Sequence, residues 1–136
     1  MGLAERRATK AFQDNQLPGL TAEIHALAGH PVPIEVNYEQ LAKPDYAESY
    51  GDFFRKVYFQ PVIDAFKAIA IDDMGKDALK TGVKKIVFQN SKDTYTAEYA
   101  VSFEGGVVMI DHDSCSNVDY VDDRARALTK VLEKGL

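Results

Sequence analysis

The chain has 136 residues, of which 46% are hydrophobic and 27% are charged, and these values are typical of a globular protein rather than a disordered one. Its net charge of -5 includes no basic block, which argues against a nucleic-acid or membrane partner, because phosphate groups are bound by concentrated lysine and arginine. With a single cysteine and no apolar run near the about 20 residues of a membrane span, we expect one cytoplasmic domain over residues 1–136 without a cofactor.

Two helices are predicted at the start of the chain. Apolar residues at three- and four-residue spacing indicate a weakly amphipathic helix over 3–16. A second helix follows, with Pro18 in its first turn and Gly29 at its end. Beyond it, apolar residues alternate with others over 32–37. Because Pro33 cannot donate a hydrogen bond to a neighbouring strand, this strand is expected at the edge of a sheet, or pairing only beyond the proline.

The most apolar helix is predicted over residues 52–70. Pro61 interrupts it, and since proline lacks the amide hydrogen and clashes with the preceding turn, we expect a kink or a new helix start there. The segment 41–52 before this helix has no usable period and is expected to be a loop. After the helix, Asp72 or Asp73 can cap a further short helix.

The clearest pattern is a β-hairpin that turns at Glu104-Gly105-Gly106, with either Glu104-Gly105 or Gly105-Gly106 as the two-residue turn. A two-residue turn pairs odd positions before it with even positions after it, so Tyr99 and Ile110 are predicted on one buried face. A second hairpin, with a four-residue loop, puts Phe88 of the preceding strand on the same face. The predicted fold class is therefore α+β. Its sheet is expected to be an antiparallel meander of strands 83–90, 95–103 and 107–112, with 32–37 as an added edge strand.

A long helix over residues 118–134 is predicted to close the chain, because apolar residues recur there every three or four positions. Ser116 or Asn117 is its expected N-cap. Aspartates near its start and lysines near its end complement the helix dipole. We expect this helix to pack across the apolar face of the sheet.

The segment from Asp111 to Asp122 is the strongest local match to a metal-binding pattern. Four aspartates fall at positions one, three, nine and twelve of a calcium loop, and they are our candidate metal ligands: Asp111, Asp113, Asp119 and Asp122. Position six is a serine where the loop needs glycine, and a strand rather than a helix precedes the segment. The alternative is that the later aspartates only complement the dipole of the final helix.

No catalytic constellation is evident in the sequence. On an extended chain His112 would meet Ser114 more readily than Asp113, because successive side chains point to opposite sides. Cys115 is a candidate reactive thiol if it lies close to the start of the final helix, and otherwise an inert, partly buried one.

Aromatic residues cluster between positions 38 and 59, and helical spacing can bury only part of this set. Our leading hypothesis is a non-catalytic binding protein that self-associates through an aromatic surface at residues 50–59. The alternative is a small enzyme or small-ligand-binding protein with a pocket between the sheet and the segment 42–51. The candidate binding residues of the two hypotheses are Tyr46, Tyr50, Tyr58, Phe59 and His112.

Overall fold

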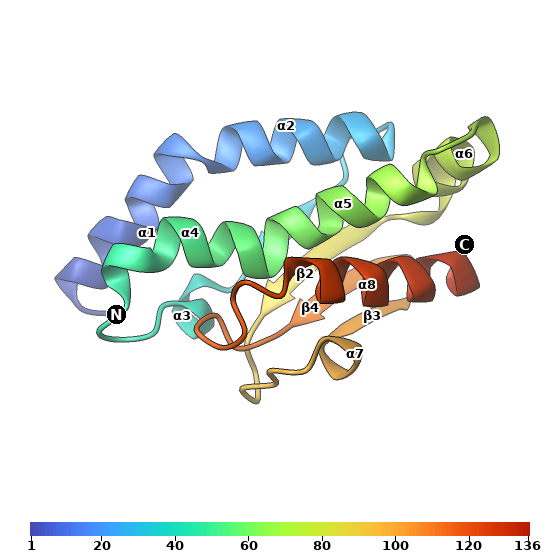
Figure 1. Ribbon diagram of the computed structural model, residues 1–136. Coiled ribbons are helices and arrows are strands. Elements are labelled where there is room, and N and C mark those ends of the chain that lie inside the picture. Colours follow the sequence, from blue (N-terminus) through green and yellow to red (C-terminus); the bar gives the residue numbers. More distant parts are fainter.

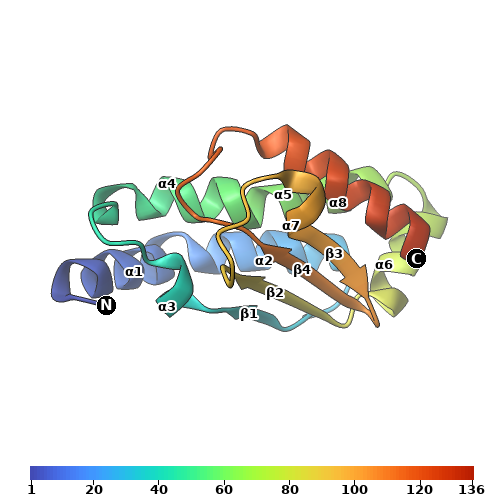
Figure 2. The same ribbon diagram turned by 90° about the horizontal axis from the view of Figure 1, so that it is seen from below.

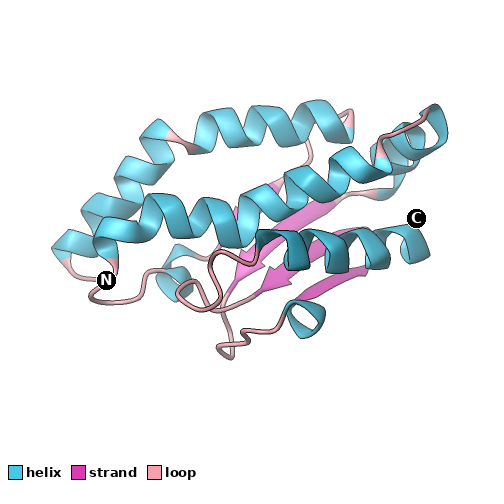
Figure 3. Ribbon diagram, in the orientation of Figure 1, coloured by secondary structure: helices cyan, strands magenta, loops and turns pink.

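The computed structural model describes residues 1–136 and places a layer of helices on one face of a four-stranded sheet (Figures 1 and 3). The strands are β1 (Ile34–Val36), β2 (Lys85–Gln89), β3 (Val101–Glu104) and β4 (Val107–Asp111). The α-helices are α1 (Leu3–Asn15), α2 (Leu17–Ala28), α3 (Tyr38–Leu41), α4 (Tyr50–Phe54), α5 (Gln60–Ile69), α6 (Asp73–Gly82), α7 (Ala97–Ala100) and α8 (Val121–Gly135). A 3-10 turn, η1 (Ala47–Ser49), precedes α4, and a π-helical segment, η2 (Arg55–Phe59), joins α4 to α5. The predicted α+β class is confirmed, and no helix has both the length and the apolar character needed to cross a bilayer.

The sheet is mixed, with the strand order β1-β2-β4-β3. β1 runs parallel to β2 and β2 parallel to β4, with Phe88 in register with Ile110, while β3 runs antiparallel to β4. The predicted edge position of the first strand is confirmed, and its pairing begins where the amide of Ile86 donates to the carbonyl of Pro33. The predicted antiparallel meander is wrong, because β2 pairs with β4 and not with β3.

The hairpin at the paired glycines is confirmed. Glu104 lies opposite Val107, and Gly105 and Gly106 between them have φ angles of 58° and 80°, a conformation that glycine adopts without a steric cost. The register also pairs odd positions before the turn with even positions after it, as predicted, and places Phe103 opposite Val108. This turn therefore fixes which residues of β4 face the helices.

The first part of the predicted strand 95–103 is not a strand. Residues 97–100 form the short helix α7, and the side chain of Tyr99 is 75% exposed instead of buried. The sequence there is Ala-Glu-Tyr-Ala, in which alanine and glutamate favour a helix over a strand. The connection from β2 therefore passes β4 and enters the sheet at its outer edge, as β3.

The ends of α2 and α6 follow their local signals. Gly29 has a φ of 79° and ends α2 in the left-handed conformation. The carboxylate of Asp72 accepts a hydrogen bond from the amide of Gly75 and so caps α6. Both ends are placed where the sequence predicts them.

The predicted cap of the last helix is wrong. α8 begins at Val121 after Tyr120. The hydroxyl of Ser116 donates to the carboxylate of Asp113 instead, at 2.6 Å. The side-chain amide of Asn117 donates to the carbonyl of Tyr95, at 2.7 Å. The side chains of Ser116 and Asn117 therefore stabilise the loop before α8.

Pro61 lies in the first turn of α5, so a helix starts at the proline as expected. The interruption before it is the π-helical segment η2. A π-helix joins each amide to the carbonyl five residues earlier, and Pro61 has no amide hydrogen to donate to the carbonyl of Lys56. That carbonyl accepts instead from the guanidinium of Arg124, at 3.2 Å. Because of the proline, the carbonyl of Lys56 has no backbone donor, and Arg124 of α8 donates to it instead.

One hydrophobic core of 25 residues fills the space between the helices and the sheet. The sheet contributes Ile86, Phe88, Val108 and Ile110, each 0% exposed. α5 packs along α8 and α2 above them (Figure 1). The strand residues between these four, in particular Val87 and Met109, belong neither to the core nor to the residues packed against it.

Candidate functional site

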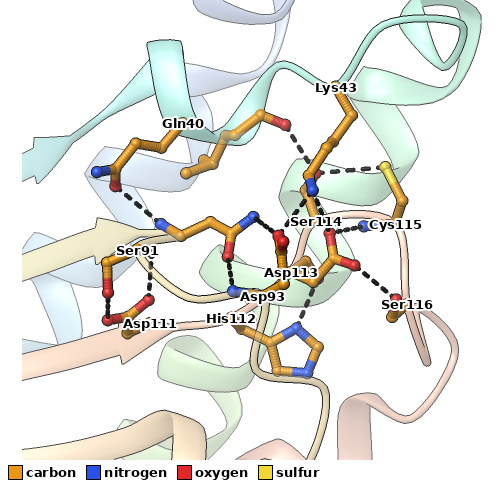
Figure 4. A network of polar contacts seen from close by, with 12 residues as sticks. Gln40, Lys43, Ser91, Asp93, Asp111, His112, Asp113, Ser114, Cys115 and Ser116 are labelled. Atoms are coloured by element: carbon orange, nitrogen blue, oxygen red, sulfur yellow. Dashed lines mark hydrogen bonds and ion pairs between the residues drawn. The ribbon is translucent and has the colours of Figure 1, made fainter.

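The loops that follow the three parallel strands meet at one edge of the sheet. Lys43 comes after β1, Asp93 after β2 and Asp113 after β4 (Figure 4). The ammonium group of Lys43 lies 2.7 Å from the carboxylate of Asp93 and 3.7 Å from that of Asp113. The carboxyl ends of parallel strands are a common place for ligand sites, so this polar cluster is the first candidate.

Sequence reasoning missed Lys43 and Asp93. The expected antiparallel hairpin placed residues 91–94 in a simple turn, and nothing in it brought that turn to Lys43. The signal that could have found them is the apolar character of β2 and β4 on both faces, since Val87 and Met109 lie between buried neighbours. Such continuous runs are typical of parallel strands, and parallel strands would bring these loops to one edge.

The carboxylates at this edge of the sheet already form hydrogen bonds or ion pairs with other residues of the chain. Asp111 accepts from the amide of Ser91 at 2.8 Å and from the side chain of Gln89 at 3.1 Å. Burial raises the pKa of Asp111, but hydrogen bonds from the Ser91 hydroxyl, the Ser91 amide and Gln89 together outweigh burial and hold the pKa below its ordinary value. The hydrogen bond from Lys43 likewise lowers the pKa of Asp93. These contacts join the loops to each other.

The structure does not bring the four predicted calcium ligands together at one place. Asp111 and Asp113 are held by the contacts of this edge, whereas Asp119 pairs with Lys56 at 2.8 Å and Asp122 is exposed on the first turn of α8. No group of three or more histidine, cysteine, aspartate or glutamate side chains is placed to hold a metal ion. In the structure Asp111, Asp113 and Asp119 form ion pairs or hydrogen bonds within the chain.

Cys115 is half-buried, and its sulfur lies 3.4 Å from the hydroxyl of Ser114. Burial raises the pKa of the thiol, so the thiolate that acts as a nucleophile is disfavoured. α8 begins only at Val121, so the proximity to a helix start that the reactive-thiol hypothesis assumed is absent. Ser114 is itself buried and donates to the carbonyl of Leu41 at 2.7 Å, rather than meeting His112.

His112 is 0% exposed, on the buried side of the sheet predicted for it. Its Nδ1 lies 2.6 Å from the carbonyl oxygen of Asp113, and since a carbonyl only accepts, Nδ1 carries the proton. Nε2 is buried without a hydrogen-bond partner. None of the five main surface recesses is lined by His112 or by residues 42–51, so the pocket proposed there from the sequence is not among them.

Through His112, the stability of the protein is expected to fall as the pH falls below the ordinary histidine pKa of about 6.5. Burial, followed by the charge of Arg124, lowers its pKa, while the bond to Asp113 and the nearby Asp111 carboxylate act in the opposite direction. Below the ordinary pKa of about 6.5 the unfolded chain binds a proton that the folded chain resists, so the free energy of unfolding decreases with falling pH, by at most about 1.4 kcal/mol per pH unit. Urea titrations at several pH values should show a smaller decrease in the free energy of unfolding with falling pH in His112→Gln, whose side-chain amide can still donate to the carbonyl of Asp113. An equal decrease in the variant and the wild type would contradict the assignment to His112.

Three of the candidate aromatic residues lie in the core. Tyr50 is 1% exposed, and Tyr58 and Phe59 are 0% exposed, so the aromatic surface predicted at residues 50–59 does not exist. The hydroxyl of Tyr58 donates to the carbonyl of His112, which ties η2 to the end of β4. Tyr46 is 47% exposed and its ring contacts Phe53, with 6.1 Å between ring centroids.

The face of the sheet turned away from the helices carries a second candidate site, which we call the open face (Figure 2). No helix lies over it. At its centre are three half-buried apolar side chains, Val87, Val107 and Met109. Around them are the other residues of alternate strand positions, namely Glu35, Lys85, Gln89, Ser102, Glu104 and Asp111.

The largest of the five main recesses lies over the solvent side of α8 and has a volume of about 840 Å³. Its walls come from α7 and the start of β3 on one side and from Ala68 of α5 on the other. Side chains of both charges line it, including Glu98, Arg126 and Lys130. It contains none of the residues that the sequence suggested.

A scan against models of known protein families found no match, and searches of curated proteins and of solved structures found none either.

Proposed function

We propose that the protein is a non-catalytic binding protein that acts through the open face of its sheet. The observation that carries the proposal is the apolar centre of this face on β2 and β4, two strands that pair in parallel. Parallel strands are usually covered on both faces and are apolar on both. Here the helices cover one face only, and Val87, Val107 and Met109 occupy the other.

Burial of the rest of these three side chains would contribute a few kcal/mol to an association, since full burial of one such side chain stabilises by about 1.5–3 kcal/mol. Polar side chains surround them, as they surround the apolar centre of many protein interfaces. A binding role also agrees with the polar cluster at the carboxyl edge, where Lys43 and three aspartates bind each other or neighbouring loops. Groups already paired in this way are poorly placed to act on a substrate.

A photo-crosslinking amino acid tests the proposed surface without knowledge of the partner. We expect p-benzoylphenylalanine at position 109, on the open face, to give protein adducts when cells that produce the chain are irradiated. The same probe in place of Ala127, a half-buried residue of the recess over α8, is the matched control and should give none. Adducts from position 127 alone, or from neither position, would contradict the proposal.

A further inference from the structure

The register of the sheet divides the open face into rows that run across the strands. One row contains Lys85 on β2, Val107 on β4 and Glu104 on β3. The next contains Val87 on β2, Met109 on β4 and Ser102 on β3. β4 is therefore the middle strand of both rows, with a cation and an anion on either side of Val107.

The arrangement of these residues is self-complementary under a two-fold rotation about an axis along β4. A two-fold axis in the interface, parallel to β4, exchanges the positions of β2 and β3. Lys85 then lies over the partner's Glu104, and Glu104 over the partner's Lys85, while Val107 and Met109 meet their own copies at the axis. Such a contact is isologous and closes as a dimer.

Both charged groups of this row are accessible for the contact. Glu104 is exposed and takes part in no salt bridge or side-chain hydrogen bond within the chain. Lys85 is 39% exposed and lies 2.9 Å from Glu35, which is itself 61% exposed. Lys85 can thus keep Glu35 and meet a second carboxylate from the opposite side. A cation and an unpaired anion that lie at symmetric positions specify a second copy better than they specify an unrelated protein.

The dimensions of packed sheets fit the same arrangement. Aligned sheets pack about 10 Å apart, with a rotation of about 30° that follows from their twist. Strand twist moves the outer strands away from a facing sheet, whereas the central strands stay close to it. The short Val107 side chain lies on the central strand, and the long Lys85 and Glu104 side chains lie in the same row on the strands beside it.

We propose that the partner of the open face is a second copy of this chain, packed sheet against sheet about a two-fold axis along β4, with Lys85 of each copy paired to Glu104 of the other. The proposal rests on the proposed function, since it names the partner of the same surface. It goes beyond that function by assigning the symmetry and the charged residues that specify it.

Charge reversal tests the arrangement by sedimentation velocity. The 15.1 kDa chain is expected to sediment as a dimer. Lys85→Glu alone and Glu104→Lys alone each create two like-charge contacts, so each should raise the dimer dissociation constant at least about tenfold. An equimolar mixture of these two variants should form a heterodimer, and the double variant should dimerise again. Lys84→Glu, which makes the same charge change just before β2, is the matched control and should leave the dimer intact.

The possible failures separate this inference from the proposed function. A dimer that Met109→Glu dissociates, but that both single charge reversals leave intact, would overturn the two-fold arrangement and leave the open face as the contact surface. A wild-type monomer with adducts to other proteins from position 109 would overturn the second copy as the partner. A dimer that Met109→Glu leaves unchanged would overturn both.

Discussion

Replacement of Arg124 by alanine is expected to lower the free energy of unfolding by about 3–4 kcal/mol. The side chain is 1% exposed although it is charged, and burial lowers its pKa only to about 10, so it stays protonated at neutral pH. Its guanidinium donates to the carbonyls of Asn117, Val118 and Lys56. Alanine would remove all three hydrogen bonds, leaving the carbonyl of Asn117 with only the amide of Tyr120 as donor, and would separate the loop before α8 from η2.

Urea unfolding at neutral pH measures this effect, and two variants serve as controls. Arg126→Ala, two residues later on the same helix, removes a guanidinium that is 72% exposed and should change stability by less than about 0.5 kcal/mol. Arg124→Lys keeps the charge but can reach fewer of the carbonyls, so it should recover part of the loss. If Arg124→Ala and Arg126→Ala were equally stable, the guanidinium would have no structural role.

The position of Arg124 is an example of what the sequence does not reveal. The apolar stripe of the last helix contains Ala125, Leu128 and Leu132, and an arginine beside them is expected in solvent. It is buried because Pro61 leaves a carbonyl free in η2, more than sixty residues earlier. Sequence reasoning found the proline and its interruption of the helix, but the acceptor becomes visible only once α8 lies against η2.

The segment η2 also explains why the prediction of an aromatic surface at residues 50–59 was wrong. In a regular helix, three successive residues cannot all face one neighbouring layer. Val57, Tyr58 and Phe59 are nevertheless each 0% exposed, because η2 departs from the α-helical period and is contacted by α1, α8 and β2. The surplus of aromatics therefore indicated a helix at the centre of the core and not an exposed interface.

Strand pairing shows where local patterns stop being sufficient. The turn at Gly105-Gly106 specifies the register of β3 and β4, and so the buried side of Val108, Ile110 and His112 was predicted correctly. The apolar character of β2 and β4 on both faces indicates parallel strands, but it does not specify which strands pair, since that depends on where the connection through α7 returns to the sheet. The polar cluster around Lys43 was missed because the expected antiparallel hairpin did not use this signal.

Two neighbouring residues of β2 test both faces of the sheet. Phe88→Ala is expected to lower the free energy of unfolding by about 3–5 kcal/mol, the usual cost of removing a buried aromatic ring. Phe88 is 0% exposed, and its ring centroid lies 4.8 Å from that of Phe59 and 5.6 Å from that of Tyr58. Val87→Ala should cost less than about 1 kcal/mol, because Val87 is half-buried and lies outside the core.

Chemical denaturation at low protein concentration, where association makes no contribution, measures both losses. At higher concentration Val87→Ala should also weaken the dimer. Phe88→Ala should affect the dimer only by lowering the stability of each folded chain. Equal losses for the two variants at low concentration would mean that both sides of β2 are covered within a single chain. Val87 would then not be available to a partner, and the open face, with the two-fold contact built on it, would lose its central observation.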